Sequence, residues 1–446
     1  MTQQQTIETL ITKNTTISTL LERPNQQKTK ILVLSDMQIS TSGVGLQAKY
    51  LIEGLLKTGR YSFRCFGGAM KHLEYKTMFI NPDFIIKPVD GFGTQQEIRH
   101  ILYTERPDAI LIITDPRQFI WLWEMEDEIH QICPIAYWHV WDNDPYPDFN
   151  KVWYESTDLI NCLSHKTYEL VKPHFPEKTN YIPHAFPNEV FFKLPENDIK
   201  ELRQKNFGEM SDWFIALWVN RNATRKMPSD LLVSWKSFLD KLQTNHGHKK
   251  ALLIMHTDPT DQEGPNLLYL TEKLNIQKNI VFSTEKINMN DMNALCNIAD
   301  CGINISRAEG FGLLCLQMLQ IGKPIIVSET GGHIRQIRNN KTGFEHGIGI
   351  KPAIRNLIGS QMVPAIYDDY VSTDDVSEAI YKLWNMPKEQ RNEIGQKASE
   401  YVQEEFNYET MITNWDKTLT DCINNFKTNK TKQWSITELE GGAKNG

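Results

Sequence analysis

The stretch from Ile303 to Ile337 constrains the fold of this chain more than any other part of the sequence. It reads INISRAEGFGLLCLQMLQIGKPIIVSETGGHIRQI. A short apolar strand leads into the turn ISRAEGFG, and the apolar run 313–321 predicts a buried helix. Gly-Lys-Pro ends that helix, a second strand covers 325–327, and a Gly-Gly pair opens another helix. This strand–turn–helix–strand order is typical of a parallel sheet in an α/β domain.

The first turn of this segment carries the residues that indicate a ligand site. Glu309 is followed by Gly310, Phe311 and Gly312, at the carboxyl end of a strand and the amino end of a helix. Open α/β sheets bind anionic ligands at this position, because the first N–H groups of the helix are unpaired. A glutamate at a helix entry also has a purely structural explanation, since the helix dipole favours it.

A similar arrangement occurs near the start of the chain. The strand KILVLSD (30–36) runs into a turn that contains Gly43 and Gly45, and an amphipathic helix follows over 46–57. A strand, a Gly-rich turn and a helix form an arrangement that cradles phosphate groups. Glycines at this point also occur for steric reasons alone.

The second half of the chain opens with the strand WFIALWV (213–219), whose continuous apolar character is typical of a buried parallel strand. The basic turn NRNATRK follows it, with Arg221 and Lys226 five residues apart. Either these side chains bind an anion, or the run is a solvated basic turn. Arg225 can take the place of Lys226; otherwise its loss is expected to be close to neutral.

These segments resemble the retaining glycosyltransferases of family 4, also called group 1. The family signature is an acidic residue, Gly-Phe-Gly, and a second Glu eight positions after the first; here Glu309 is the first, and Gln317 replaces the second. In the family, the first Glu faces the donor sugar and the second holds the ribose of the nucleotide. An amide can still bond ribose hydroxyls, because it both donates and accepts.

The resemblance also implies roles for other residues. Arg221 and Lys226 would clamp the donor diphosphate, and His139 would lie at the donor sugar, although a buried core histidine is an equal alternative. With Glu309 they form the implied catalytic set. The implied donor-binding residues are Gly43, Gly45, Gly310, Phe311, Gly312, Leu313, Gln317, Gly331 and Gly332.

The loop HVWDNDPYPD (139–148) suggests a place for the acceptor. Rings such as Trp141 pack on the C–H faces of sugars, and Asp142 and Asp144 can accept hydrogen bonds from hydroxyls. A plain surface loop is nearly as good an explanation. The Asp-x-Asp spacing is also found in the metal site of the other major glycosyltransferase fold, but short Asp-x-Asp pairs are common by chance. We therefore expect no metal and no cofactor besides the nucleotide-sugar co-substrate.

With 446 residues, the chain is too long for one core. The resemblance implies an α/β fold with two facing Rossmann-like domains of the GT-B type and a C-terminal helix that crosses back to the first domain. The expected parts are an N-terminal extension (1–28), an acceptor domain (29–190), a nucleotide-sugar-binding domain (191–405), a crossover helix (406–427) and a disordered tail (428–446). The connection 344–372 is an acceptor flap, an oligomer contact or plain surface.

Composition excludes several classes of partner. The formal net charge is −7, so no basic field favours nucleic acid or an anionic membrane. The seven cysteines contain no CxxC pair, which indicates reduced thiols and a cytoplasmic location. The N-terminus has no signal-peptide pattern, and no stretch has the apolar length of a membrane span. Peripheral contact with a membrane-bound acceptor is compatible with these features, and the sequence does not define the oligomeric state.

The expected reaction is transfer of a hexose-type sugar, with retention, from a nucleotide sugar to a hydroxyl of a carbohydrate-type acceptor such as a glycan, glycolipid or glycoprotein. Three alternatives stay open. The first is a nucleotide-sugar epimerase or hydrolase on the same fold. The second is a scaffold that binds nucleotide without turnover. The third is a viral-type transferase acting on DNA bases, which the acidic loop 142–148 disfavours because it would repel phosphates.

Overall fold

Each half of the chain builds a parallel sheet around its most apolar strand. In the computed structural model, which describes residues 28–430, β1 (Thr29–Asp36) lies inside the first sheet and β9 (Phe214–Val219) inside the second. Both strands are buried along most of their length, as expected for apolar strands covered on two faces. The predicted extension 1–28 and tail 428–446 lie outside the described residues, apart from their inner ends.

The first sheet has eight strands in the order β3-β4-β2-β1-β5-β6-β7-β8. All neighbouring pairs are parallel except β3 with β4. The other strands are β2 (Tyr61–Gly68), β3 (Met78–Asn81), β4 (Phe84–Pro88), β5 (Ala109–Ile113), β6 (Ile135–His139), β7 (Leu159–Cys162) and β8 (Thr179–Tyr181). The helices of this domain are α2 (Gly43–Lys57), α3 (Gln95–Thr104), α4 (Ile120–Trp123), α5 (Glu126–His130), α6 (Lys151–Glu155) and α7 (His165–Val171).

The second sheet has six parallel strands in the order β11-β10-β9-β12-β13-β14. Its strands besides β9 are β10 (Ala251–His256), β11 (Ile280–Ser283), β12 (Cys301–Asn304), β13 (Ile325–Ser328) and β14 (Gly347–Ile350). The helices are α8 (Glu196–Phe207), α9 (Pro228–His246), α10 (Leu267–Lys273), α11 (Met289–Ile298), α12 (Leu313–Gln320), α13 (His333–Ile337), α14 (Thr373–Asn385) and α15 (Lys388–Glu405).

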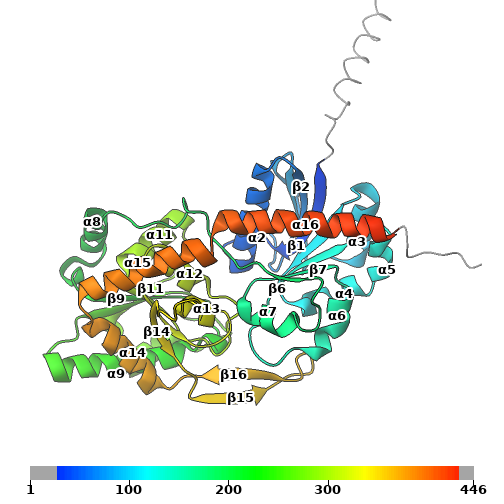
Figure 1. The fold of residues 1–446 in the computed structure, drawn as a ribbon. Coiled ribbons are helices and arrows are strands. Elements are labelled where there is room, and N and C mark those ends of the chain that lie inside the picture. The colour runs from blue at the N-terminus through cyan, green and yellow to red at the C-terminus, as the bar shows by residue number, and fades with distance from the viewer. Residues whose placement is uncertain (1–27, 431–446) are drawn as a thin grey trace, which may run out of the picture.

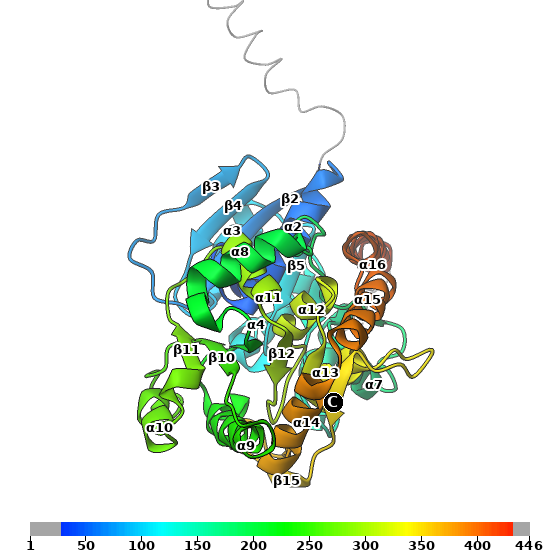
Figure 2. The ribbon, with the colours of Figure 1, turned by 90° about the vertical axis from the view of Figure 1, so that its left-hand side faces the viewer.

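Alternate residues of β9 face two different cores, which explains why both faces of the second sheet are covered. Trp218 packs with side chains of α9 and α14, whereas Leu217 belongs to the core that contains α11 and α12. Figure 2 shows these helices on the two sides of the sheet. Both domains are thus Rossmann-like layers of helix, sheet and helix, as the sequence predicts.

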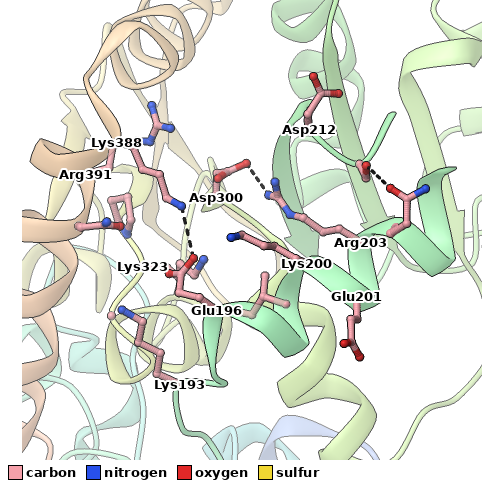
Figure 3. Close-up of a pocket in the computed structure, with 16 residues that line it drawn as sticks. Lys193, Glu196, Lys200, Glu201, Arg203, Asp212, Asp300, Lys323, Lys388 and Arg391 are labelled. Atoms are coloured by element: carbon pink, nitrogen blue, oxygen red, sulfur yellow. Dashed lines mark hydrogen bonds and ion pairs between the residues drawn. The ribbon is translucent and has the colours of Figure 1, made fainter. Parts of the chain in front are cut away.

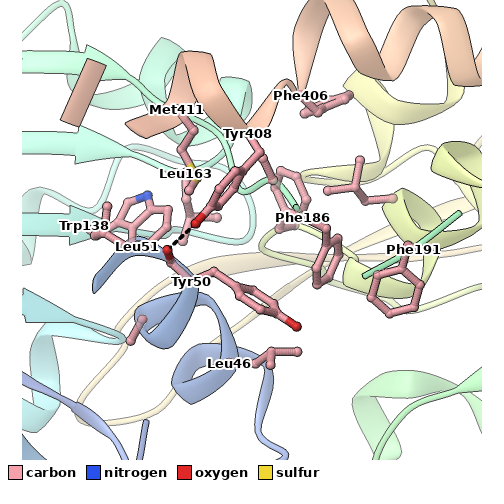
Figure 4. Close-up of a cluster of buried hydrophobic side chains, with 14 of the residues drawn as sticks. Leu46, Tyr50, Leu51, Trp138, Leu163, Phe186, Phe191, Phe406, Tyr408 and Met411 are labelled. Atoms are coloured by element: carbon pink, nitrogen blue, oxygen red, sulfur yellow. Dashed lines mark hydrogen bonds between the residues drawn. The ribbon is translucent and has the colours of Figure 1, made fainter. Parts of the chain in front are cut away.

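The last helix, α16 (Tyr408–Lys430), crosses back onto the first domain (Figure 1), as predicted. The hydroxyl of Tyr408 donates to the backbone oxygen of Tyr50 on α2 at 2.7 Å (Figure 4). A Cβ at Gly54 would lie 2.2 Å from Ile412, so α2 and α16 pack this closely only with a glycine there. The surrounding aromatic cluster, which includes Phe186 of the segment between β8 and α8, makes the cores of the two domains continuous.

Two features of the second half differ from the sequence prediction. The predicted crossover helix 406–427 begins two residues later, at Tyr408, because Phe406 leaves the helical conformation between α15 and α16. The connection 344–372 contains β14 and an antiparallel hairpin, β15 (Ile354–Ile358) with β16 (Ile366–Tyr370). This hairpin extends toward the first domain (Figure 1), where Arg355 binds Asp144 at 2.8 Å.

All seven cysteines are buried and none forms a disulfide, in agreement with the reduced thiols that the sequence predicts. Burial raises the pKa of several of these thiols, including Cys296 to about 12, so they are not reactive thiolates at neutral pH. Within residues 28–430, none of the helices combines the length and the apolar character that crossing a bilayer would require.

Candidate active site

Two helix N-termini, one from each domain, face each other where the domains meet. A Cβ at Gly43, the first residue of α2, would lie 2.8 Å from the side chain of Leu313, the first residue of α12. The N-cap of α2 is Ser42, which accepts a hydrogen bond from the N–H of Gly45, whereas the N-cap of α12 is Gly312 and has no side chain. The positive ends of both helix dipoles therefore point into the same region.

Glu309 lies beside these helix ends and is almost fully buried. Its carboxylate forms an ion pair with Lys226 at 2.5 Å, in which the side chains are only 11% and 13% exposed. The same oxygen, Oε2, accepts hydrogen bonds from Asn304 and Ser306, both at 3.2 Å. Oε1 makes no hydrogen bond with any described residue, so this oxygen is available to a ligand.

The charges around Glu309 keep it ionised. Burial by itself opposes ionisation, but Lys226 and Arg225 outweigh it and hold the pKa of Glu309 well below its ordinary value. Burial also lowers the pKa of Lys226, and the carboxylate opposes this shift. Glu309 is therefore ionised near neutral pH, inside a site that largely excludes water.

Arg225 also belongs to this site. Its guanidinium donates to the backbone oxygen of Ala308, next to Glu309, and to Asp142 of the first domain at 3.2 Å. Arg225 thus joins the two domains directly beside the buried carboxylate. The sequence indicated this residue only as a substitute for Lys226, because nothing in a short basic turn shows which way each side chain points.

Arg221, which the family resemblance assigned to the diphosphate clamp, does not contact Glu309. Its guanidinium is 61% exposed and forms ion pairs with Asp261 at 2.8 Å and Glu263 at 2.9 Å. Both carboxylates belong to the loop after β10. Arg221 can reach the site only if it leaves these two partners.

His139 is also absent from the site. It ends β6 and is fully buried, with Nε2 hydrogen-bonded to the hydroxyl of Tyr154 on α6 at 2.7 Å. Burial lowers its pKa to about 3, so the ring is neutral at physiological pH. The sequence identified the strand end correctly but not the side of the sheet to which the ring points. The structure therefore has the alternative in which His139 is a buried core residue.

A different histidine, His333, lies near Glu309 at the start of α13. Its Nδ1–H donates to the backbone oxygen of Ser328 at 3.2 Å, while Nε2 is buried without a partner among the described residues. Burial lowers its pKa to about 4, although Glu309 acts in the opposite direction. A neutral ring with a free acceptor atom can receive a hydrogen bond from a bound hydroxyl. In the sequence, only its position immediately after Gly331-Gly332 indicated that His333 lies near the candidate site.

The acidic loop of the first domain is a domain contact rather than an open acceptor surface. Trp141 is buried against Phe149. Asp142 pairs with Arg225, and Asp144 pairs with Lys166 at 2.5 Å and with Arg355 of the hairpin. Both carboxylates of the Asp-x-Asp pair are therefore bound by cationic side chains of the protein.

The glycines of the Glu309 segment allow the two domains to approach closely. A Cβ at Gly310 would lie 2.4 Å from Val140 of the first domain. Gly331 has a positive φ of 48°, and a Cβ there would lie 2.0 Å from the backbone oxygen of Glu309 and 2.5 Å from that of Asp142. A Cβ at Gly332 would lie 2.5 Å from the backbone of Phe311.

The remaining donor-binding candidates have mixed surroundings. The Phe311 ring packs against His184 and Phe406 in the core between the domains, so only its backbone can face a donor. Gln317 lies on α12 and is 6% exposed, and its side chain makes no hydrogen bond among residues 28–430. This free amide is compatible with the predicted ribose contact.

A cavity of about 560 Å³ lies next to the Gly-rich turn of the first domain. Asp36, Ser40 and Ser42 line it from the end of β1 and the turn, and Lys286 lines it from the second domain. Burial raises the pKa of Asp36. The cavity has the size of a small-molecule site and lies beside the N-terminus of α2.

We expect Arg225→Ala to lower turnover more than Arg221→Ala, about tenfold or more, because only Arg225 contacts the Glu309 segment. The measurements are turnover and donor dissociation constant for both variants, with Arg225→Lys as the control that keeps the charge. Normal turnover in Arg225→Ala together with loss of turnover in Arg221→Ala would show that Arg221 leaves Asp261 and Glu263 when the donor binds.

Comparison with known proteins agrees with this arrangement. Residues 198–346 match the family model described as glycosyl transferases group 1. This region includes β9, Lys226, Glu309 and α12. The second domain is therefore similar to the group 1 glycosyltransferases over these residues.

A curated relative is N-acetyl-alpha-D-glucosaminyl L-malate synthase of Bacillus anthracis, 23% identical over 280 residues. The match covers 62% of this chain and 63% of the relative, so it spans less than two thirds of either. Among solved structures, sucrose-phosphate synthase from Thermosynechococcus elongatus has a TM-score of 0.70 at 14% identity, covering 89% of this chain and 100% of that one. Anabaena Alr3699/HepE in complex with UDP and glucose has a TM-score of 0.64 at 14% identity, covering 88% and 100%. The fold of the two domains is therefore GT-B, as predicted.

Proposed function

We propose that this protein is a retaining glycosyltransferase that moves a sugar from a nucleotide sugar to an acceptor hydroxyl. The observation that carries the proposal is the ionised Glu309, buried against Lys226 where the N-termini of α2 and α12 face each other. A buried ion pair costs desolvation free energy, so its position at two helix N-termini where the domains meet indicates a functional site.

The leaving nucleoside diphosphate would be stabilised by the helix N-termini, Lys226 and Arg225. Negative charge grows on the diphosphate as the glycosidic bond breaks, so fixed positive groups stabilise the transition state more than the bound donor. Arg221 would join them after exchanging its partners Asp261 and Glu263 for phosphate oxygens. Gln317 would bond the ribose.

Glu309 would face the donor sugar through its free oxygen, Oε1. A carboxylate there stabilises the positive charge that develops on the anomeric carbon, and it orients sugar hydroxyls. The acceptor proton would pass to a donor phosphate oxygen on the same face, which gives retention without a covalent enzyme intermediate.

The acceptor would enter the cavity lined by Asp36 and Lys286. Similar proteins include a sucrose-phosphate synthase and an N-acetyl-alpha-D-glucosaminyl L-malate synthase, and one structural neighbour was solved with UDP-glucose. We therefore propose UDP sugars as the first donors to test, and hydroxyl acceptors that are sugars or sugar derivatives.

The test is a thermal-shift screen of nucleotide sugars, followed by product analysis with and without candidate acceptors. A donor that binds the folded state raises the melting temperature by mass action. Transfer with an unchanged anomeric configuration supports the proposal. If no nucleotide sugar shifts the transition, the site does not bind donors, and if sugar is released equally with and without acceptor, the protein is a hydrolase.

We also expect transfer to continue in EDTA, because Lys226, Arg225 and the helix N-termini occupy the role that a divalent cation has in other glycosyltransferases. The measurement is turnover before and after chelation. Loss of transfer in EDTA that manganese restores would instead assign a metal to Asp142 and Asp144.

A further inference from the structure

A second cluster of charged side chains lies at the edge of the second sheet opposite to Glu309. Strands β9, β12 and β13 begin there, and helices α8 and α15 start beside them. The cluster surrounds a cavity of about 570 Å³ (Figure 3). The cationic residues that line it are Lys193, Lys200, Arg203, Lys323, Lys388 and Arg391.

Two of these cations already have structural roles. Arg203 binds Asp300 at 2.7 Å and donates to the backbone oxygen of Ile298. Arg391 donates to the backbone oxygens at the C-terminus of α14, including that of Met386. The four lysines are left as the charges available to a ligand.

Three of these lysines interact with the carboxylate of Glu196, and Asp300 also acts on Lys323. Glu196 pairs weakly with Lys388, at 3.4 Å. Although desolvation acts in the other direction, Lys388, Lys193 and Lys323 lower the pKa of Glu196. Figure 3 shows Lys200, Lys323 and Lys388 extending into the space beside Glu196, whereas Glu201 points away from it.

Most of the ammonium groups have no partner. Those of Lys193, Lys200 and Lys323 make no hydrogen bond or ion pair with any residue in the described range 28–430. Burial lowers the pKa of Lys323 despite the nearby carboxylates of Asp300 and Glu196, which reflects the cost of burying this charge without a direct ion pair. An anion in the cavity would remove that cost.

Two helices present free N–H groups at the same place. The N-caps of α8 and α15 are Pro195 and Pro387, and neither makes a side-chain capping bond. Lys388 is the first residue of α15, where the helix dipole disfavours a cation. Uncapped N–H groups together with lysines are the groups that bind phosphate in proteins.

We propose that this cavity is a second anion site that binds a small phosphorylated metabolite. The phosphate would lie between Lys200, Lys323 and Lys388, at the N-terminus of α15. The cavity is larger than a phosphate ion, and Ile199 and Pro324 in its lining offer apolar contact to the rest of a phosphate ester. The site is separate from the donor site, because it lies at the opposite ends of the strands.

The test measures the affinity of the full chain for inorganic phosphate and for glucose 6-phosphate by calorimetry. The double variant Lys200→Gln/Lys388→Gln changes exposed side chains and should bind at least tenfold more weakly. Lys205→Gln, on the same helix α8 but outside the cavity, is the matched control and should bind normally. Lys226→Met removes a cation of the donor site and should not change this affinity.

Three results would overturn the proposal. The first is no binding of either anion, and the second is loss of binding in Lys226→Met but not in the double variant, which would place the anion in the donor site. Equal affinity for the two anions would overturn the assignment to a phosphate ester. Because the readout is binding rather than sugar transfer, the outcome does not depend on the proposed enzymatic function.

Discussion

Glu309→Gln is expected to reduce sugar transfer about 100-fold, equivalent to about 3 kcal/mol of transition-state stabilisation. The variant keeps the shape of the side chain but removes the charge that faces the donor sugar. It also leaves Lys226 buried without a counterion, and breaking a buried pair in this way costs about 3–5 kcal/mol of folding free energy. A fall in activity alone would therefore not separate a catalytic role from a structural one.

The double variant Glu309→Gln/Lys226→Met makes that separation. Removing both charges should recover much of the lost folding free energy, measured by urea denaturation, while turnover stays low. As a control, Glu405→Gln breaks a comparably buried pair with Arg335, at 2.7 Å, and should lower stability without lowering turnover at saturating donor. Recovery of transfer in the double variant would show that Glu309 serves only to neutralise Lys226.

The same pair makes a prediction about pH. The folded-state pKa of Glu309 is lowered, so its contribution to stability is fully present above the ordinary carboxyl pKa and is lost as the pH falls below it. Between about pH 6 and about pH 3, the wild-type protein should lose more free energy of unfolding than Glu309→Gln/Lys226→Met. Equal losses in the two proteins would mean that Glu309 is not ionised in the pair.

The fold was predictable because short sequence patterns identify most of its strands and turns. Continuous apolar runs such as 213–219 identify buried parallel strands, and glycines identify the turns between strands and helices. The hairpin β15–β16 escaped prediction, because all of β15 is exposed and its sequence lacks the pattern of a buried strand.

A site residue was predictable where its position in a strand, turn or helix determines where its side chain points. Other site residues were not predictable. Glu309 follows the end of β12 and precedes the first turn of α12, so its turn lies at the carboxyl edge of the sheet where ligands bind. The choice between Arg221 and Arg225 depends on a short 3₁₀ turn, Thr224–Lys226, that the sequence does not specify. For His139, both directions are available at a strand end, and the neighbour Tyr154 that receives the ring comes from a separate helix.

Gly331→Ala is expected to have the other large effect. The position has a positive φ, and the added Cβ would collide with a backbone oxygen of each domain, those of Glu309 and Asp142. Left-handed strain costs about 1 kcal/mol, and overpacking adds about 1–3 kcal/mol. Relief requires the Glu309 segment to move, and a displacement of about 1 Å can lower turnover about 100-fold.

Gly343→Ala is the matched control. Gly343 also has a positive φ, of 72°, but a Cβ there would meet nothing within 4 Å. This variant should therefore show only the conformational cost, about 1 kcal/mol in urea denaturation, with normal turnover. The difference in stability and turnover between Gly331→Ala and Gly343→Ala therefore measures the effect of the close approach of the domains, separately from the backbone strain that both variants have. If both variants have the same stability and turnover, the loops that carry Glu309 and Asp142 do not meet at Gly331, and the closed arrangement of the two domains around the site is wrong.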